Sequence, residues 1–80
     1  MARYMEPTHR LDVLGHYCPV PVKHARKSLE KLNVGDVLEV LADDPETLHD
    51  VPILVNRLGH KLVEILKLSG EFKFIIEVCE

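Results

Sequence analysis

The spacing of apolar residues predicts a helix in the first half of the chain. The residues at helical intervals are Val22, Ala25, Leu29 and Leu32. Charged side chains fill most of the positions between them, so one face of this helix is apolar. The segment Cys18-Pro19-Val20-Pro21 comes first. Its prolines are tolerated because amides in a first helical turn have no intrahelical acceptor to lose. The pattern predicts a helix from about Pro19 to Leu32.

Shorter apolar runs predict four strands. The first covers residues 11–14 and ends at Gly15, and the second covers residues 37–41, after a turn at 33–36. The chain closes with two runs at 62–68 and 72–78, the second alternating strictly between apolar and polar residues. The sequence Ser69-Gly70-Glu71 separates them, which favours a β-hairpin.

A second helix is predicted between the second and third strands. Asp44 precedes Pro45 and suits a cap or turn. A helix that began there would hold Pro52 several residues inside it, where proline removes a hydrogen bond. We therefore expect a short turn and then a helix from about Asp50 to Leu58, ended by Gly59.

The predicted order is β-α-β-α-β-β, which favours an α+β two-layer sandwich with two helices on one face of a four-stranded sheet. Eighty residues with 46% hydrophobic content suit one compact core. We expect residues 1–9 to be a flexible lead-in and residues 10–80 to form a single domain.

Composition restricts the classes of function. The net charge of −3, with both signs interspersed, gives no broad positive field for nucleic acid. A membrane-spanning helix needs roughly 18 consecutive apolar residues, and no such run exists. The N-terminus lacks the features of a secretory signal. Two widely separated cysteines match neither a disulfide framework nor a zinc finger. We expect a cytoplasmic monomer with free thiols, no metal and no cofactor.

Cys18 is the predicted nucleophile. If the first two strands are parallel, their carboxyl ends share one edge of the sheet, where ligands collect in α/β folds. Cys18 lies at this edge and directly before a helix, whose unpaired amides lower the pKa of a thiol. Pro19 and Pro21 stiffen this helix start. Cys79, beside the C-terminus, is interpreted as structural or incidental.

Nearby polar residues are candidate auxiliaries. His16 could act as a proton donor or cationic partner to the thiolate, or could simply be exposed. Lys23, Arg26 and Lys27 form a basic stripe on the first helix. The stripe could dock an acidic partner surface or hold a persulfide anion, or be an ordinary solvated face.

Several motifs in order resemble the TusA/SirA/YedF family of sulfur-carrier proteins over residues 9–77. They are Leu11-Asp12-x-x-Gly15-x-x-Cys18-Pro19-x-Pro21, Arg26-Lys27, Gly35-Asp36, Asp43-Asp44-Pro45, Asp50-Val51-Pro52 and Gly59-His60. The chain departs from the commonest family pattern at His16 and Tyr17, which bears on the choice of partner.

The resemblance implies a mixed sheet of order 1-2-4-3 with the fourth strand antiparallel to the others. It also implies that Cys18 accepts sulfane sulfur as a persulfide from a cysteine desulfurase or rhodanese. The sulfur would then pass to an acceptor protein in tRNA thiolation, molybdenum-cofactor synthesis or related sulfur metabolism. The chain would be a sulfurtransferase-type carrier, not a stand-alone enzyme.

Two other interpretations stay open. In one, the chain is a non-catalytic regulatory or protein-interaction module, and the Cys-Pro-Val-Pro turn only starts a helix. In the other, it is a thiol oxidoreductase, which is disfavoured because no resolving cysteine is predicted within reach of Cys18.

Overall fold

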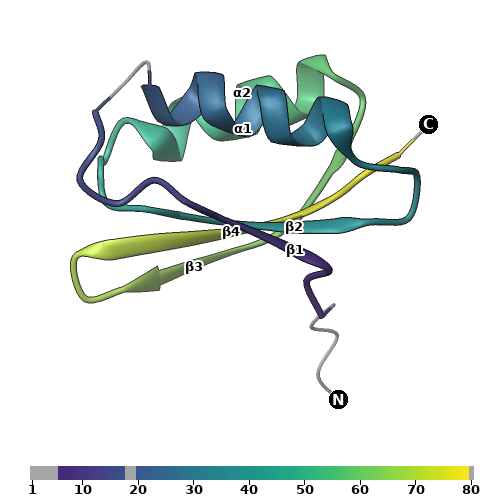
Figure 1. Cartoon of the computed structure of the whole chain (residues 1–80). Coiled ribbons are helices and arrows are strands. Elements are labelled where there is room, and N and C mark those ends of the chain that lie inside the picture. Colours follow the sequence, from purple (N-terminus) through teal and green to yellow (C-terminus); the bar gives the residue numbers. More distant parts are fainter. Residues whose placement is uncertain (1–5, 18–19, 80) are drawn as a thin grey trace.

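The computed structural model describes residues 6–17 and 20–79 of the chain. Its elements alternate along the sequence before the final hairpin (Figure 1). They are β1 (His9–Asp12), α1 (Val20–Lys31), β2 (Val37–Ala42), α2 (Thr47–Arg57), β3 (Lys61–Leu68) and β4 (Glu71–Glu77). The predicted element order β-α-β-α-β-β is confirmed.

The four strands form one mixed sheet in the order β1-β2-β4-β3. β1 pairs with β2 in parallel, and β4 lies antiparallel between β2 and β3. Both helices cover the same face of this sheet (Figure 1). The two-layer sandwich and its sheet order therefore agree with expectation.

The core lies between the sheet and the helices. Because side chains alternate across a strand, every second residue of β2 and β4 points toward the helices. Phe74 of β4 lies opposite Val40 of β2 and is fully buried. Ala25 and Leu29 of α1 close over them from the helix layer. Truncating a buried aromatic ring of this kind to alanine costs about 3–5 kcal/mol.

A charged cluster marks the sheet face that the helices leave uncovered. Glu39 of β2 is only 6% exposed. Arg10 Nε lies 3.6 Å from one of its carboxylate oxygens, and Lys73 Nζ lies 3.8 Å from the other. These cations come from the strands on either side of β2, so the charges help to fix the strand register.

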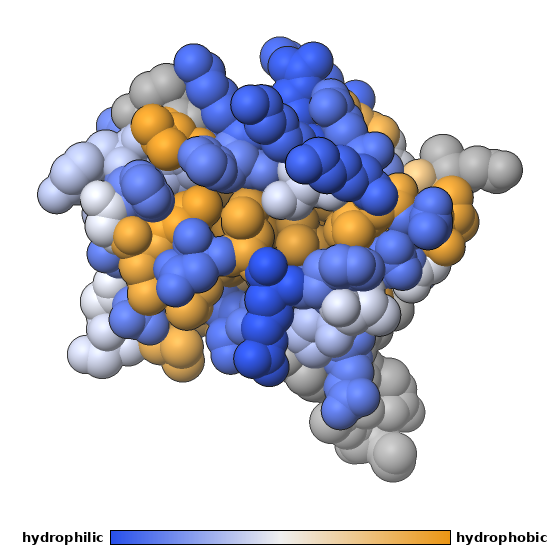
Figure 2. Space-filling model, in the orientation of Figure 1, coloured by the Kyte–Doolittle hydropathy of each residue, from blue (hydrophilic) through white to orange (hydrophobic). Residues whose placement is uncertain are grey.

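The polarity of the molecular surface differs between the helix layer and the region just below it. Figure 2 shows hydrophilic side chains over the helix layer and an apolar band between that layer and the sheet. β1, at one edge of the sheet, has only four residues. Within residues 6–17 and 20–79, no helix is long and apolar enough to span a membrane.

The predicted start of the second helix was wrong. α2 begins at Thr47 instead of Asp50, and Pro52 lies inside it. The first turn is built from Asp44, whose carboxylate accepts the Glu46 amide at 3.1 Å and whose carbonyl accepts the Thr47 hydroxyl at 2.6 Å. This confirms Asp44 as a turn residue. Pro52 removes one helical hydrogen bond but stays between Val51 and Leu54, two of the residues that anchor α2 in the core.

Candidate functional site

The predicted meeting of the first two strand ends is confirmed. The Val13 amide donates to the Leu41 carbonyl at 2.8 Å, which continues the β1–β2 pairing beyond β1. One turn further, the Gly15 amide donates to both carboxylate oxygens of Asp43, at 3.1 Å each. A side chain from the end of β2 therefore holds the loop that leads to α1.

Cys18 and Pro19 lie outside the described residues. Tyr17 and Val20 flank them, and the Val20 amide donates to the Tyr17 carbonyl at 2.9 Å. Val20 is the first residue of α1, and Pro21, the second, is buried. In the sequence, only Pro19 separates Cys18 from the start of α1. The first turn of α1 accommodates Pro21 without losing a hydrogen bond.

The loop before Cys18 brings His16 against the first helix. The His16 ring stacks on the His24 ring of α1, with centroids 5.9 Å apart and an angle of 22° between the planes. Both residues are exposed. The pair joins the loop that follows β1 to α1.

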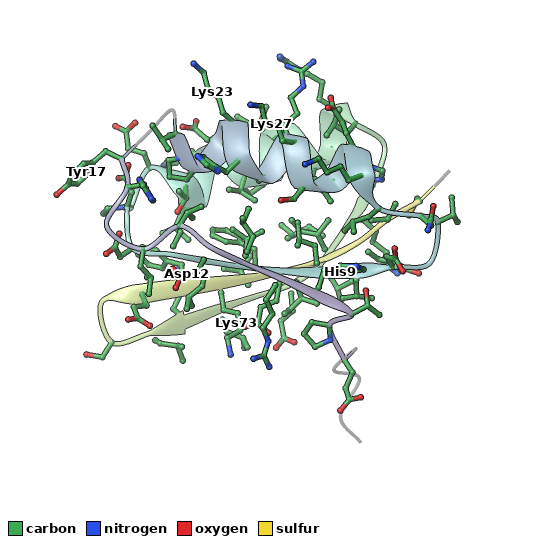
Figure 3. The ribbon with its side chains drawn as sticks, in the orientation of Figure 1. His9, Asp12, Tyr17, Lys23, Lys27 and Lys73 are labelled. Atoms are coloured by element: carbon green, nitrogen blue, oxygen red, sulfur yellow. The ribbon has the colours of Figure 1, made fainter. Side chains whose placement is uncertain are left out.

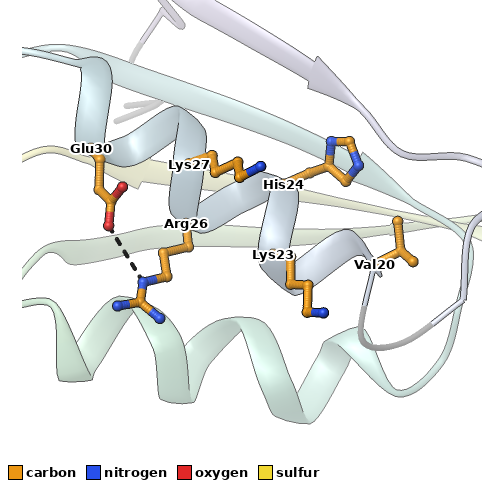
Figure 4. A pocket seen from close by; sticks show the side chains of 6 residues that line it. All are labelled: Val20, Lys23, His24, Arg26, Lys27 and Glu30. Atoms are coloured by element: carbon orange, nitrogen blue, oxygen red, sulfur yellow. Dashed lines mark ion pairs between the residues drawn. The ribbon is translucent and has the colours of Figure 1, made fainter.

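The predicted basic stripe lies on the exposed side of α1. Lys23, Arg26 and Lys27 line an open hollow of about 430 Å³ together with His24. Figure 4 shows Lys23 and Arg26 pointing toward α2, and His24 and Lys27 pointing the other way. Arg26 Nε also lies 3.4 Å from Glu30, one turn along the helix.

A second hollow reveals residues that the sequence analysis missed. It has a volume of about 550 Å³ and lies between α1 and α2. Lys23 and Arg26 approach it from α1, and Ile53 and Arg57 approach it from α2. Ile53 is 55% exposed although it lies in an apolar stretch of sequence. The i, i+4 spacing of Ile53 and Arg57 places them on one face of α2, and this spacing could have identified them from the sequence.

Cys79 lies beyond the opposite end of the sheet, as the antiparallel β4 requires. Its amide donates to His60 Nδ1 at 3.0 Å, and its thiol to the Glu77 carbonyl at 3.6 Å. Cys79 is a free thiol and partly buried. A structural or incidental role for Cys79 stays a prediction.

Among residues 6–17 and 20–79, no three His, Cys, Asp or Glu side chains lie close enough together to hold a metal ion.

Comparisons with known proteins agree on one family. The family model described as "Sulfurtransferase TusA" matches residues 9–78. A protein of Archaeoglobus fulgidus named "Putative sulfur carrier protein" is 46% identical over 72 residues, covering 89% of this chain and 94% of that protein. A protein of Thermotoga maritima with the same name is 38% identical, and the match covers 98% of this chain and 99% of that protein.

A solved structure extends this similarity to three dimensions. The crystal structure of the SirA-like protein from Desulfitobacterium hafniense matches with a TM-score of 0.79 and 31% identity. The match covers 90% of this chain and 99% of that one. Both the sheet order and the helix layer therefore have a counterpart in an experimental structure of a related protein.

Proposed function

The chain belongs to the TusA sulfurtransferase family, and we propose that it carries sulfane sulfur as a persulfide on Cys18. The family match and the relatives named as sulfur carriers support a sulfur-carrier role. The observation that carries the finer proposal is the position of Cys18 in the chain. In the sequence it stands two residues before Val20, where α1 begins, and the loop that leads to it leaves the edge where β1 and β2 both end.

The first step of the proposed cycle is a thiol exchange. The Cys18 thiolate attacks the outer sulfur of a donor protein's cysteine persulfide. A new S–S bond forms at Cys18, the donor's S–S bond breaks, and the donor cysteine leaves as a thiolate. The proton on the outer sulfur passes to water. No net oxidation occurs, so the step requires no cofactor.

In the second step Cys18 is the sulfur donor, and a cysteine of the acceptor protein is the nucleophile. An acceptor cysteine attacks the outer sulfur on Cys18, and Cys18 is released as a thiolate. The partners are then a sulfur donor, such as a cysteine desulfurase or rhodanese, and an acceptor protein of tRNA thiolation, molybdenum-cofactor synthesis or related metabolism. Free thiols of this kind suit the reducing conditions of the cytoplasm.

The start of α1 supports this chemistry electrostatically. Pro21 has no N–H and the Val20 amide donates to the Tyr17 carbonyl, so the stabilisation of an anion comes from the helix dipole and from the amides that remain in the first turn. The exposed cations of α1 add to this field, and His16 stacks on His24 at its side. A thiolate and a persulfide anion at Cys18 gain from both effects.

The basic stripe is proposed to dock the donor. Lys23, Arg26 and Lys27 are exposed on the helix that follows Cys18, and the hollow between α1 and α2 extends this surface to Arg57. Charge attraction of this kind speeds encounter and weakens with salt. We expect the KM for the donor to rise with ionic strength.

The decisive experiment is sulfur loading followed by mass spectrometry. The protein is incubated with a cysteine desulfurase and cysteine, and peptide masses are recorded without reductant. We expect one added sulfur on Cys18 that a reducing agent removes. Cys18→Ser should abolish it, and the matched control Cys79→Ser should keep it. If neither a desulfurase nor a rhodanese with thiosulfate loads wild-type protein, the carrier proposal fails and an interaction module remains.

A further inference from the structure

The side chain of Tyr17 is exposed to solvent, although the backbone around it is held by hydrogen bonds. Its exposed fraction of 75% is the highest among the large hydrophobic residues in the described part of the chain. The backbone around it is held on both sides. The His16 amide donates to the Val13 carbonyl at 3.2 Å, and the Tyr17 carbonyl accepts the Val20 amide at 2.9 Å. Figure 3 shows the Tyr17 side chain pointing away from the body of the molecule.

These bonds hold the backbone of a residue with a large exposed ring, next in sequence to the predicted nucleophile. Consecutive Cα atoms are about 3.8 Å apart, and an S–S bond is about 2.05 Å long. A protein that brings a cysteine to Cys18 therefore also brings its own surface to Tyr17. A single exposed apolar residue is ordinary on a protein surface, but an exposed ring at the point of sulfur exchange is covered whenever a partner docks.

We propose that Tyr17 is a specificity-determining contact for the sulfur donor, resting on the proposed carrier function. Its ring enters an apolar recess at the mouth of the donor's active site, where an acceptor group takes the phenol hydrogen. Tyrosine suits this role because it buries a large area at a low entropic cost, having only two side-chain torsions. Tyrosines at the centre of interfaces often dominate binding.

The neighbours of Tyr17 define the rest of the complementary surface. His16 and His24 stack next to it, and Lys23 and Lys27 follow on α1. The donor recess is therefore expected to be apolar at its centre and acidic on the side that faces α1. A protein with the same active-site cysteine but a closed or basic recess would be a poor donor.

The test compares a protein donor with a small one. Loading rates of wild type, Tyr17→Ala and Tyr17→Phe are measured with a cysteine desulfurase and, separately, with inorganic polysulfide. Val34→Ala is the matched control because Val34 is 67% exposed at the opposite end of the sheet. We expect Tyr17→Ala to raise the KM for the desulfurase about tenfold, the scale of a moderate interface contact. Polysulfide loading should not change.

The variants separate the possible outcomes. Tyr17→Phe should retain most of the affinity, and Val34→Ala all of it. If Tyr17→Ala loads from the desulfurase with wild-type KM, the inference is overturned and the carrier function stands. Equal slowing with polysulfide also overturns it, because Tyr17 would then act on Cys18 itself. Wild-type protein that accepts no sulfur from either source overturns the carrier function first.

Discussion

The two ends of the sheet hold their loops by different means. At the end that leads to Cys18, an Asp43 carboxylate holds the Gly15 amide, and His16 and Tyr17, which follow, are exposed. At the opposite end, Gly35 donates to the Val78 carbonyl at 3.0 Å, and Val78 donates to the Asp36 carbonyl at 2.8 Å. There Cys79 contributes both its amide and its thiol to hydrogen bonds.

This difference supports the proposal that Cys18, and not Cys79, carries the sulfur. The hydrogen bonds around Cys79 engage its thiol and hold its backbone, so they restrict access to the sulfur. At the other end, Asp43 holds the loop at Gly15, and His16 and Tyr17 after it are exposed. A sulfur-exchange residue needs an approach that a partner can reach.

The largest expected contrast is in thiol reactivity. We predict that Cys18 reacts with iodoacetamide at least about tenfold faster than Cys79 in the native protein, since a helix N-terminus favours the thiolate. Timed quenching and peptide mass spectrometry measure the two rates. In guanidinium the rates should converge, because the folded environment is lost. Equal rates in the native protein would contradict the contrast.

A matched pair of glycine variants tests the two ends directly. Gly15 has φ +81° and Gly35 has φ +96°, and a Cβ at either position meets nothing within 4 Å. Gly15→Ala and Gly35→Ala should each lower the free energy of unfolding by about 1–2 kcal/mol, because L-residues resist this backbone conformation. Urea titration measures this loss.

Sulfur loading then distinguishes the two glycine variants. Only Gly15→Ala should slow it, because Gly15 lies on the loop that Asp43 holds in front of Cys18. Slowing by Gly35→Ala to the same degree would mean that loading depends on general stability.

A smaller effect is expected at His60. His60→Ala removes the acceptor of the Cys79 amide and should cost about 1 kcal/mol of stability. Alkylation of Cys79 should become faster while that of Cys18 stays constant. His49→Ala serves as the control, since His49 is exposed on α2. Faster alkylation of both cysteines would indicate general loosening instead.

The smallest effect is expected for the ion pair on α1. Arg26 and Glu30 are both largely exposed, with Nε and the carboxylate 3.4 Å apart. Glu30→Gln should change the free energy of unfolding by less than about 0.5 kcal/mol, as exposed pairs generally do. Thermal unfolding measures it. A loss above about 1 kcal/mol, the upper end of the range for exposed pairs, would show that the stripe has a structural role.

Sequence periodicity predicted the fold well because most elements have one apolar face. The hairpin at β3 and β4 and the helix at Val20–Lys31 follow directly from such patterns. The predicted start of α2 was wrong because proline usually breaks a helix, and Pro52 was therefore expected to lie near the start of α2 instead of inside it. In the structure, core contacts of Val51 and Leu54 compensate for the hydrogen bond that Pro52 removes.

The site was only partly predictable, for a different reason. The meeting of the β1 and β2 ends at the loop that leads to Cys18 follows from the parallel arrangement of the two strands, which topology rules supply. The Gly15–Asp43 bond and the His16–His24 stack depend on the conformation of loops, and loops have no periodicity to read. Tyr17 was noted as a departure from the family pattern, but its exposure required the structure.

The central position of β4 also has a consequence for synthesis of the protein. β4 is the last strand to be made, yet it lies between β2 and β3 and connects them. Until it has left the ribosome, β3 has no partner and the sheet consists of β1 and β2 alone. Long-range strand pairing of this kind is slow, and unpaired strand edges are prone to aggregate. The nascent chain therefore completes its sheet only after synthesis of nearly the whole domain.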